Sequence, residues 1–235
     1  MKVLILAGGL GARFSEETTK KPKPLVEIGG KPIIWHVMKI YAHYGFKDFI
    51  VLIGYKGDML KKYFNSFVEE DWNVQLLETG DGTLKSQRLK QAEPFIDGDN
   101  FFLSYGDDVS DVSPKKVLET HLKSNNIVTL SAFPLVSDFG ILELDGNNQI
   151  KQFREKPRIQ NHWINGGFFC MSKEIFKYLE DTEKELEDEV FADLTKINKI
   201  GAMPHEGFWK SMNTMKDKAQ LEELINKNQA PWIKW

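Results

Sequence analysis

Cysteine, long apolar runs and net charge are all scarce in this sequence. Cys170 is the only cysteine, which excludes an intrachain disulfide and a cysteine-based zinc cluster and fits a reducing compartment. No apolar run approaches the roughly 18 residues of a membrane-spanning helix, and Met1 and Lys2 lead directly into a short strand instead of a signal-peptide core. The net charge of −3 provides no general attraction to nucleic acid or to an anionic membrane. We therefore expect a cytoplasmic protein with no nucleic-acid or membrane partner.

The first 135 residues alternate between strand-like and helix-like patterns. Short apolar runs predict strands over 2–7, 48–53, 73–77, 100–105 and 127–133, and amphipathic stretches predict helices over 33–44, 57–67 and 113–124. This alternation predicts an α/β fold with a mostly parallel sheet covered by helices on both faces. Ligands of such sheets bind at the carboxyl ends of the strands.

The pattern changes from about residue 139 onward. Two short strands joined by Asp145-Gly146-Asn147-Asn148 predict a hairpin, and a further strand is expected over 165–171. The acidic run over 180–189 is typical of a solvated helix face. No linker, repeat or low-complexity tract interrupts the 235 residues, of which 41% are hydrophobic. We therefore expect one domain, in which this half is a small α+β elaboration of the same sheet.

A glycine-rich loop follows the first strand, in the stretch LAGGLGARFSEETTKKPKPL over residues 6–25. It does not fit the dinucleotide pattern GxGxxG, because Phe14 stands where the third glycine would lie, and the Walker A pattern is absent as well. Glycines allow backbone N–H groups to approach an anion, while Arg13 provides a planar fork of donors and Lys23 a point charge. The loop therefore predicts a site for a polyphosphate.

Further motifs follow this loop in a fixed order. They are VEIGGKPI at Val26, GYKG at Gly54, TGD at Thr79, YGD at Tyr105, EKP at Glu155, INGGFF at Ile164 and HEGFW at His205. This ordered set resembles the nucleotide-sugar pyrophosphorylases, a nucleotidyltransferase family, and within it the members that transfer cytidylyl groups. The resemblance implies a Rossmann-like nucleotidyltransferase fold with a mixed, mostly parallel sheet. Residues 1–135 would mainly bind nucleotide and residues 136–235 mainly bind the acceptor.

The resemblance also implies roles for individual residues. Nucleotide binding is implied for Leu6, Ala7, Gly8, Gly9, Gly11, Arg13, Lys23, Thr79 and Arg88, and Arg13 and Lys23 would also be catalytic. Asp107 would hold Mg²⁺ or Mn²⁺, and the acceptor would be bound by Lys156, Asn165 and Gly166. Lys85, Gln87 and Glu189 are further candidates for acceptor binding that the resemblance does not itself supply. The implied reaction brings two highly charged groups together, so cations beside the phosphates address its main difficulty.

Several residues depart from the family pattern. Asn213 stands where the family has an aspartate that is a second metal ligand, and Asp108 is a candidate to replace the missing carboxylate. Lys85-Ser86-Gln87-Arg88 replaces a segment of smaller residues that closes over nucleotide and sugar. The stretch over 67–73 is shorter than in the family members that act on glucose 1-phosphate, where an insertion helps to build subunit contacts. A homo-oligomer is compatible with the resemblance but does not follow from it.

These observations leave three functions open. The first is a cytidylyltransferase that joins CMP from CTP to a sugar 1-phosphate such as glucose 1-phosphate, releasing pyrophosphate and giving a CDP-activated unit for surface polysaccharide. The second keeps this chemistry but uses a non-sugar phosphate, for example phosphoglutamine for capsule modification, which would suit the polar Lys85, Gln87 and Arg88. The third is a nucleotide-binding regulatory subunit that has lost catalysis, as Asn213 suggests.

Overall fold

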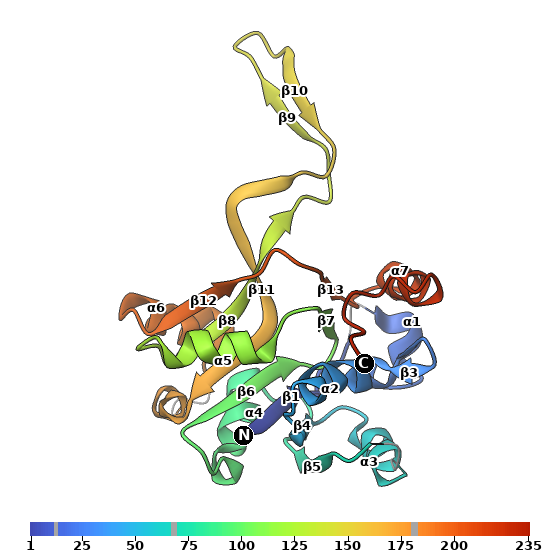
Figure 1. The fold of residues 1–235 in the computed structure, drawn as a ribbon, viewed down its shortest axis with the longest axis vertical. Helices are drawn as coiled ribbons and strands as arrows, with labels where there is room; N and C mark the ends of the chain where they lie inside the picture. Colours follow the sequence, from blue (N-terminus) through green and yellow to red (C-terminus); the bar gives the residue numbers. More distant parts are fainter. Residues whose placement is uncertain (12–13, 67–69, 180–182) are drawn as a thin grey trace.

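Seven strands form the central sheet of the protein (Figure 1). The computed structural model describes residues 1–11, 14–66, 70–179 and 183–235. In order across the sheet the strands are β12 (Ile200–Pro204), β8 (Val128–Val136), β11 (Arg158–Ser172), β6 (Asn100–Tyr105), β1 (Lys2–Leu6), β4 (Asp48–Ile53) and β5 (Asn73–Glu78). Strand β11 runs antiparallel to both of its neighbours, and all other pairs are parallel. The predicted mixed, mostly parallel sheet is confirmed.

Each face of the sheet carries its own hydrophobic core. Successive side chains of a strand point to opposite faces, so Val3 and Ile5 of β1 belong to one core and Leu4 to the other. The first core is covered by α2 (Ile33–His43), α3 (Gly57–Asn65), α5 (Pro114–Leu122) and α7 (Met215–Asn226). The second is covered by α4 (Lys85–Gln91), α6 (Ala192–Lys196) and the 3₁₀ helix Lys173–Tyr178. Helices on both faces, as predicted, give a three-layer fold.

The predicted elements of the first half lie close to their expected bounds. Helix α2 is preceded by Pro32 and followed by Gly45, whose φ of +90° is a conformation that other residues rarely adopt. Shorter elements complete this half: α1 (Ser15–Thr18), β2 (Glu27–Ile28), β3 (Lys31–Pro32), and 3₁₀ helices over Lys23–Leu25 and Glu93–Phe95. No helix within the described ranges is long and apolar enough to cross a membrane.

The strand order reverses beside β1. The chain passes from β1 to β4 and β5 on one side, and then returns to β6 on the other side of β1. Loops that leave the carboxyl ends of β1 and β6 therefore turn in opposite directions and leave a crevice between them. This crevice lies where the glycine-rich loop leaves β1.

A short ladder that the sequence did not reveal joins the two halves of the chain. Strand β7 (Asp108–Ser110), directly after β6, pairs antiparallel with β13 (Trp209–Ser211). The pairing is continued by a hydrogen bond from the Met212 N–H to the Asp107 carbonyl, 3.0 Å long. It brings the segment containing Asn213 beside the end of β6.

The predicted hairpin forms an arm that projects from the body of the protein (Figure 1). Its strands are β9 (Ile141–Leu144) and β10 (Ile150–Arg154), and the turn at Asp145 is closed by hydrogen bonds from the Asn147 and Gln149 N–H groups to its carboxylate. The next strand, β11, begins at Arg158 and is therefore longer than the predicted 165–171. Its outer part connects the arm to the sheet.

The acidic run after β11 differs from the prediction. Residues 180–182 lie outside the described part, and Leu186–Phe191 forms a single π-helical turn. Leu186, Val190 and Phe191 are buried in the second core, so this turn packs against the sheet and is not simply a solvated helix face. Glu183, Asp188 and Glu189 are exposed, as the prediction of a solvated face requires, but the prediction overlooked the apolar residues between the charges, which bind the turn to the core.

A buried histidine makes the stability of this fold depend on pH. His36 of α2 lies 3.0 Å from the Ile28 carbonyl through Nε2, and Nδ1 accepts a hydrogen bond from the Trp232 indole at 3.3 Å. Both contacts suit a neutral ring that carries its proton on Nε2. Burial, together with the nearby charge of Lys31, lowers the pKa of His36 from 6.5 to about 4.

We predict that the free energy of unfolding falls as the pH drops from 6.5 toward 4. In this window His36 is protonated in the unfolded chain but stays neutral in the folded chain. The resulting loss of unfolding free energy is about 3 kcal/mol at the lower end of the window. Urea unfolding of His36→Gln across this range should show a flatter pH dependence. His121→Gln is the variant for comparison. Burial lowers the pKa of His121 as well, so this substitution should remove a separate part of the pH dependence. An unchanged pH profile in His36→Gln would contradict the assignment.

Candidate active site

A cavity of about 390 Å³ occupies the crevice at the carboxyl ends of β1 and β6. It is lined by Leu6, Ala7, Gly8, Gly9, Gly11, Lys23, Pro24, Thr83, Lys85, Arg88, Tyr105, Gly106 and Asp107. This lining contains seven of the residues that were expected to bind nucleotide. They are Leu6, Ala7, Gly8, Gly9, Gly11, Lys23 and Arg88. Loop, cation and carboxylate therefore meet at one place, as the sequence predicted for a strand-end site.

Arg88 lies beneath the glycine-rich loop and holds it. Its guanidinium donates hydrogen bonds to the carbonyls of Gly8 at 3.0 Å and Thr83 at 3.1 Å, and to the Thr79 hydroxyl. A Cβ atom on Gly8 would lie 2.1 Å from Arg88 Nη1, so only glycine permits this contact. Burial lowers the pKa of Arg88, but an arginine remains protonated in such a setting. Arg88 thus sets the shape of the loop and adds positive charge below it.

Lys23 links three distant parts of the chain at one edge of the cavity. Its ammonium group donates to the Asp107 carboxylate and, at 2.9 Å, to Oδ1 of Asn213. The Lys23 side chain is 11% exposed and that of Asp107 is 24% exposed, so the ion pair is shielded but reachable. Asn213 is oriented by its own bonds, since Nδ2 donates to the Ser211 hydroxyl at 2.9 Å. The predicted catalytic lysine and two of the predicted metal ligands are therefore in direct contact.

The oxygens of Asp107 and Asn213 both point toward a positive charge. Carboxylate and amide oxygens are the donors that Mg²⁺ accepts, usually one or two from the protein with the remainder from water and phosphate. Within the described residues, no group of three or more His, Cys, Asp or Glu side chains is placed to hold a metal. A protein site with one carboxylate and one amide therefore suits a metal that is held partly by a phosphate ligand.

A second network lies beside the cavity, around Tyr105. The Tyr105 hydroxyl donates to the Glu187 carboxylate and accepts from Nδ2 of Asn165 at 3.1 Å. Lys85 Nζ lies 2.6 Å from the other oxygen of Glu187 and 5.5 Å from the centroid of the Tyr105 ring. Burial, and next the charge of Glu187, raise the pKa of Tyr105, so the hydroxyl keeps its proton and acts as a donor.

Glu187 and Tyr105 are among the site residues that the sequence analysis did not predict. Glu187 comes from the π-helical turn Leu186–Phe191, which presents it to Tyr105, while Glu189, the predicted acceptor ligand, accepts the Glu185 N–H at 2.8 Å. Nothing in the run ELEDEVF distinguishes these acids, because their directions depend on the irregular turn. π-Helical turns occur frequently at functional sites.

The remaining predicted residues lie in several places. Thr79 is buried and donates to the Ile53 carbonyl at 2.8 Å, so it supports Arg88 from below the cavity. The Gln87 side chain accepts the Leu84 N–H at 2.9 Å and caps α4. Arg13 lies outside the described residues. The roles of these residues in binding stay predictions.

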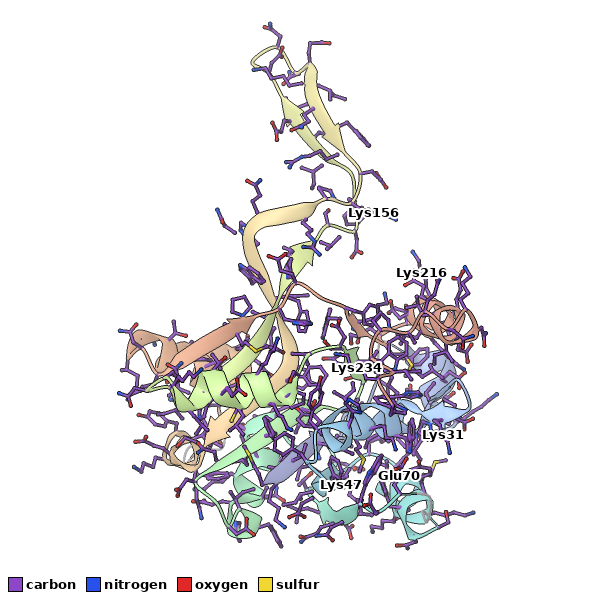
Figure 2. The ribbon with its side chains drawn as sticks, in the orientation of Figure 1. Lys31, Lys47, Glu70, Lys156, Lys216 and Lys234 are labelled. Atoms are coloured by element: carbon purple, nitrogen blue, oxygen red, sulfur yellow. The ribbon has the colours of Figure 1, made fainter. Side chains whose placement is uncertain are left out.

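The acceptor-side residues are only partly gathered at the cavity. Gly166 accepts the indole N–H of Trp209 at 2.8 Å, which leaves Asn165 as the member that reaches the Tyr105 network. Asp108 is buried in β7 and does not line the cavity. Lys156 is exposed at the base of the arm, as Figure 2 shows, and is absent from the cavity lining. The structure thus places Lys85 and Asn165 at the site and Lys156 apart from it.

Comparison with known proteins shows the family to which the chain belongs. The model of the family described as nucleotidyl transferase matches residues 2–227. The chain belongs to the nucleotidyl transferase family. It is 40% identical, over the full length of both chains, to glucose-1-phosphate cytidylyltransferase of Salmonella typhi, and 37% identical to the probable glucose-1-phosphate cytidylyltransferase of Bacillus subtilis (strain 168), again with both chains fully covered.

Solved structures show the same fold. HddC from Yersinia pseudotuberculosis superimposes with a TM-score of 0.75 at 23% identity, covering 95% of this chain and 99% of that one. A UDP-glucose pyrophosphorylase complexed with UDP-glucose superimposes with a TM-score of 0.74 at 18% identity, covering 97% and 98%. These likenesses establish the Rossmann-like fold of the nucleotidyl transferase family for this chain.

We predict that Arg88→Ala lowers the free energy of unfolding by about 2–4 kcal/mol. The change removes the hydrogen bonds that Arg88 donates to the carbonyls of Gly8 and Thr83 and to the Thr79 hydroxyl, and it opens space below the loop. Chemical unfolding followed by circular dichroism would measure it. Arg158→Ala is the matched control, because Arg158 is exposed and contacts only Glu206 among the described hydrogen bonds, so a change within about 0.5 kcal/mol is expected. Equal effects of the two substitutions would show that Arg88 does not support the loop.

Proposed function

We propose that this nucleotidyltransferase joins CMP from CTP to a sugar 1-phosphate, with glucose 1-phosphate as the first candidate acceptor. The observation that carries the proposal is the contact of Lys23 with Asp107 and Asn213 at the edge of a cavity at the strand switch point. The full-length similarity to two glucose-1-phosphate cytidylyltransferases supports both CTP and glucose 1-phosphate. The product would be a CDP-activated building block, which we assign to the synthesis of surface polysaccharide in the cytoplasm.

In the proposed reaction a phosphate oxygen of the acceptor attacks the α-phosphorus of CTP. A bond forms between that oxygen and the α-phosphorus, the bond from the α-phosphorus to the bridging oxygen breaks, and pyrophosphate leaves with the bond electrons. The attacking oxygen is already anionic, so no strong general base is needed. The protein must instead hold two anions together, and in this proposal Lys23 and the backbone amides of Gly8, Gly9 and Gly11, which line the cavity, would do so.

A divalent cation is part of the proposal, at the edge of the cavity where Asp107 and Asn213 meet Lys23. Asp107 and Asn213 would hold Mg²⁺ or Mn²⁺ through one carboxylate and one amide oxygen, since both already face a cationic group. The metal would supply charge neutralisation at the phosphates of the nucleotide. Asn213 contributes no charge, so we expect weaker metal binding than two carboxylates would give. Lys23 would then share the phosphates with the metal and release its contact with Asp107.

A second candidate acceptor is a phosphorylated amino acid such as phosphoglutamine. The observation that favours it is the Lys85–Glu187 ion pair beside Tyr105, 2.6 Å between Nζ and Oε2. A neutral sugar needs hydrogen-bond donors and acceptors, whereas an amino acid offers an ammonium group to Glu187 and a carboxylate to Lys85. Lys85 is about two-fifths exposed, so its charge is accessible from the cavity.

We predict pyrophosphate release from CTP when the protein is incubated with Mg²⁺ or Mn²⁺ and glucose 1-phosphate. UTP, ATP, GTP and dTTP should react at least about tenfold more slowly, and each nucleotide is assayed against a panel of sugar 1-phosphates and phosphorylated amino acids. Glu187→Gln separates the acceptors, because loss of the carboxylate should raise KM about tenfold or more for an amino acid and much less for glucose 1-phosphate. Asp188→Asn, which removes a neighbouring charge, is the control.

The outcomes of this panel distinguish the proposals. Turnover with glucose 1-phosphate alone would retire the amino-acid acceptor, and faster turnover with another nucleotide than with CTP would overturn the cytidylyl assignment. No turnover on any acceptor, combined with tight binding of CTP, would show a nucleotide-binding regulatory subunit that has lost catalysis.

A further inference from the structure

The backbone of Asn213 is held on both sides. It follows β13, whose ladder with β7 is continued by the hydrogen bond from the Met212 N–H to the Asp107 carbonyl, 3.0 Å long. On the other side, Oδ2 of Asp217 accepts the Asn213 N–H at 3.1 Å and the Thr214 N–H at 2.9 Å. These bonds set where the Asn213 side chain begins, so the direction of its amide group is what remains to be determined.

The side-chain amide of Asn213 has a partner at each end. Oδ1 accepts from the Lys23 ammonium at 2.9 Å, and Nδ2 donates to the Ser211 hydroxyl oxygen, also at 2.9 Å. An ammonium group can only donate, so it requires the amide oxygen, while a hydroxyl oxygen can accept from the amide nitrogen. A reversed amide would place its NH₂ group against the Lys23 ammonium. Lys23 and Ser211 together therefore select the orientation in which the amide oxygen points toward Lys23.

This orientation matters because an amide has a single oxygen. A carboxylate presents an oxygen from either end, whereas a reversed amide would present N–H groups, which repel a cation. In the proposed reaction Lys23 moves its contact to the phosphates and no longer orients Asn213. The bond to Ser211 does not involve Lys23, so it would keep the amide in the same direction. By accepting from Nδ2 it also polarises the amide and makes Oδ1 a stronger ligand.

We propose that Ser211 is a positioning residue that makes Asn213 an effective ligand for the divalent cation. This inference rests on the proposed function, in which Asp107 and Asn213 hold Mg²⁺ or Mn²⁺. Ser211 acts through the Asn213 amide and not by touching the metal, as the outer hydrogen-bond partners of metal ligands commonly do. The serine thus offsets part of the loss of the carboxylate that the family pattern has at position 213.

The other side chains of β13 have separate tasks. Successive side chains of a strand point to opposite faces, so Trp209 and Ser211 share one face of β13 and Lys210 lies on the other. The Trp209 indole donates to the Gly166 carbonyl at 2.8 Å, and Lys210 Nζ lies 2.6 Å from Oδ1 of Asp217. Removing the Ser211 hydroxyl therefore leaves these contacts and the backbone ladder with β7 in place, and its effect should be local.

The factor by which Mn²⁺ tightens CTP binding tests the proposal without turnover. Isothermal titration calorimetry with no acceptor present gives the Kd of CTP in EDTA and in Mn²⁺, and the ratio of the two values reports the contact between protein and metal. Ser211→Ala should lower this ratio about tenfold and leave the Kd in EDTA within about twofold of wild type. Ser66→Ala, which removes an exposed hydroxyl at the end of α3, is the matched control.

Two further variants of Ser211 separate the hydroxyl from the shape of the side chain. Ser211→Thr keeps the hydroxyl and should retain most of the ratio. Ser211→Val has the shape of the threonine without the hydroxyl, so it should repeat the loss seen in Ser211→Ala. Circular dichroism checks that each variant is folded. Equal ratios in the threonine and valine variants would overturn the proposal.

A double substitution shows whether Ser211 acts through the amide. In an Asn213→Asp background either end of the carboxylate offers an oxygen, so adding Ser211→Ala should lower the ratio less than about threefold. Equal losses in both backgrounds would show that Ser211 supports the ladder and does not orient the amide, which would overturn the proposal.

The same measurement distinguishes this inference from the proposed function. A wild-type ratio near one would show that the protein does not contact the metal, and it would overturn the metal site together with this inference. A raised wild-type ratio that Ser211→Ala leaves unchanged would overturn the inference alone and leave the proposed function standing.

Discussion

The contact of the Lys23 ammonium with Asp107 and Asn213 is the interaction on which the site depends. It joins residues 84 and 190 positions apart, from the loop after β1, the end of β6 and the segment after β13. The first two segments leave neighbouring strands of the central sheet and the third leaves β13, and the β7–β13 ladder holds the last two together. The central sheet fixes where β1 and β6 end, and this contact fixes how the loops beyond them meet.

The same contact explains how a cavity rich in charge is tolerated. Lysine and aspartate neutralise each other in the structure, and in the proposed reaction both would change partner when phosphates and a cation bind. The Tyr105 network beside the cavity repeats this arrangement, since Lys85 pairs there with Glu187. In both places a basic residue is paired with an acid that a charged substrate can replace. We infer that two anionic substrates would replace ion pairs within the protein by ion pairs between protein and substrate. No charged side chain would then be left without a partner, either before or after the substrates bind.

The sequence predicted the parts of the fold that depend on local pattern. The buried strands β1, β4 and β6 are short apolar runs, and α2 carries an amphipathic stripe ended by Gly45, so periodicity alone located them. The loop after β1 was recognised by glycines next to Lys23, and the ordered motifs pointed to the family that the comparisons confirm. The β7–β13 ladder was not predictable, because three-residue strands about 100 positions apart leave no local signal. Glu187 was missed because its direction depends on an irregular helical turn, and Arg88 supports the loop through backbone carbonyls that side-chain patterns do not reveal.

The turnover of Lys23→Ala is the most direct test of the central claim. With CTP, Mg²⁺ and the acceptor that proves active, kcat for pyrophosphate release should fall by about 10²–10³, because one preorganised charged donor is lost where negative charge is concentrated. Lys21→Ala, which removes a lysine paired at 3.3 Å with exposed Glu27, should turn over normally. A folded Lys23→Ala protein with near-normal kcat would contradict the account.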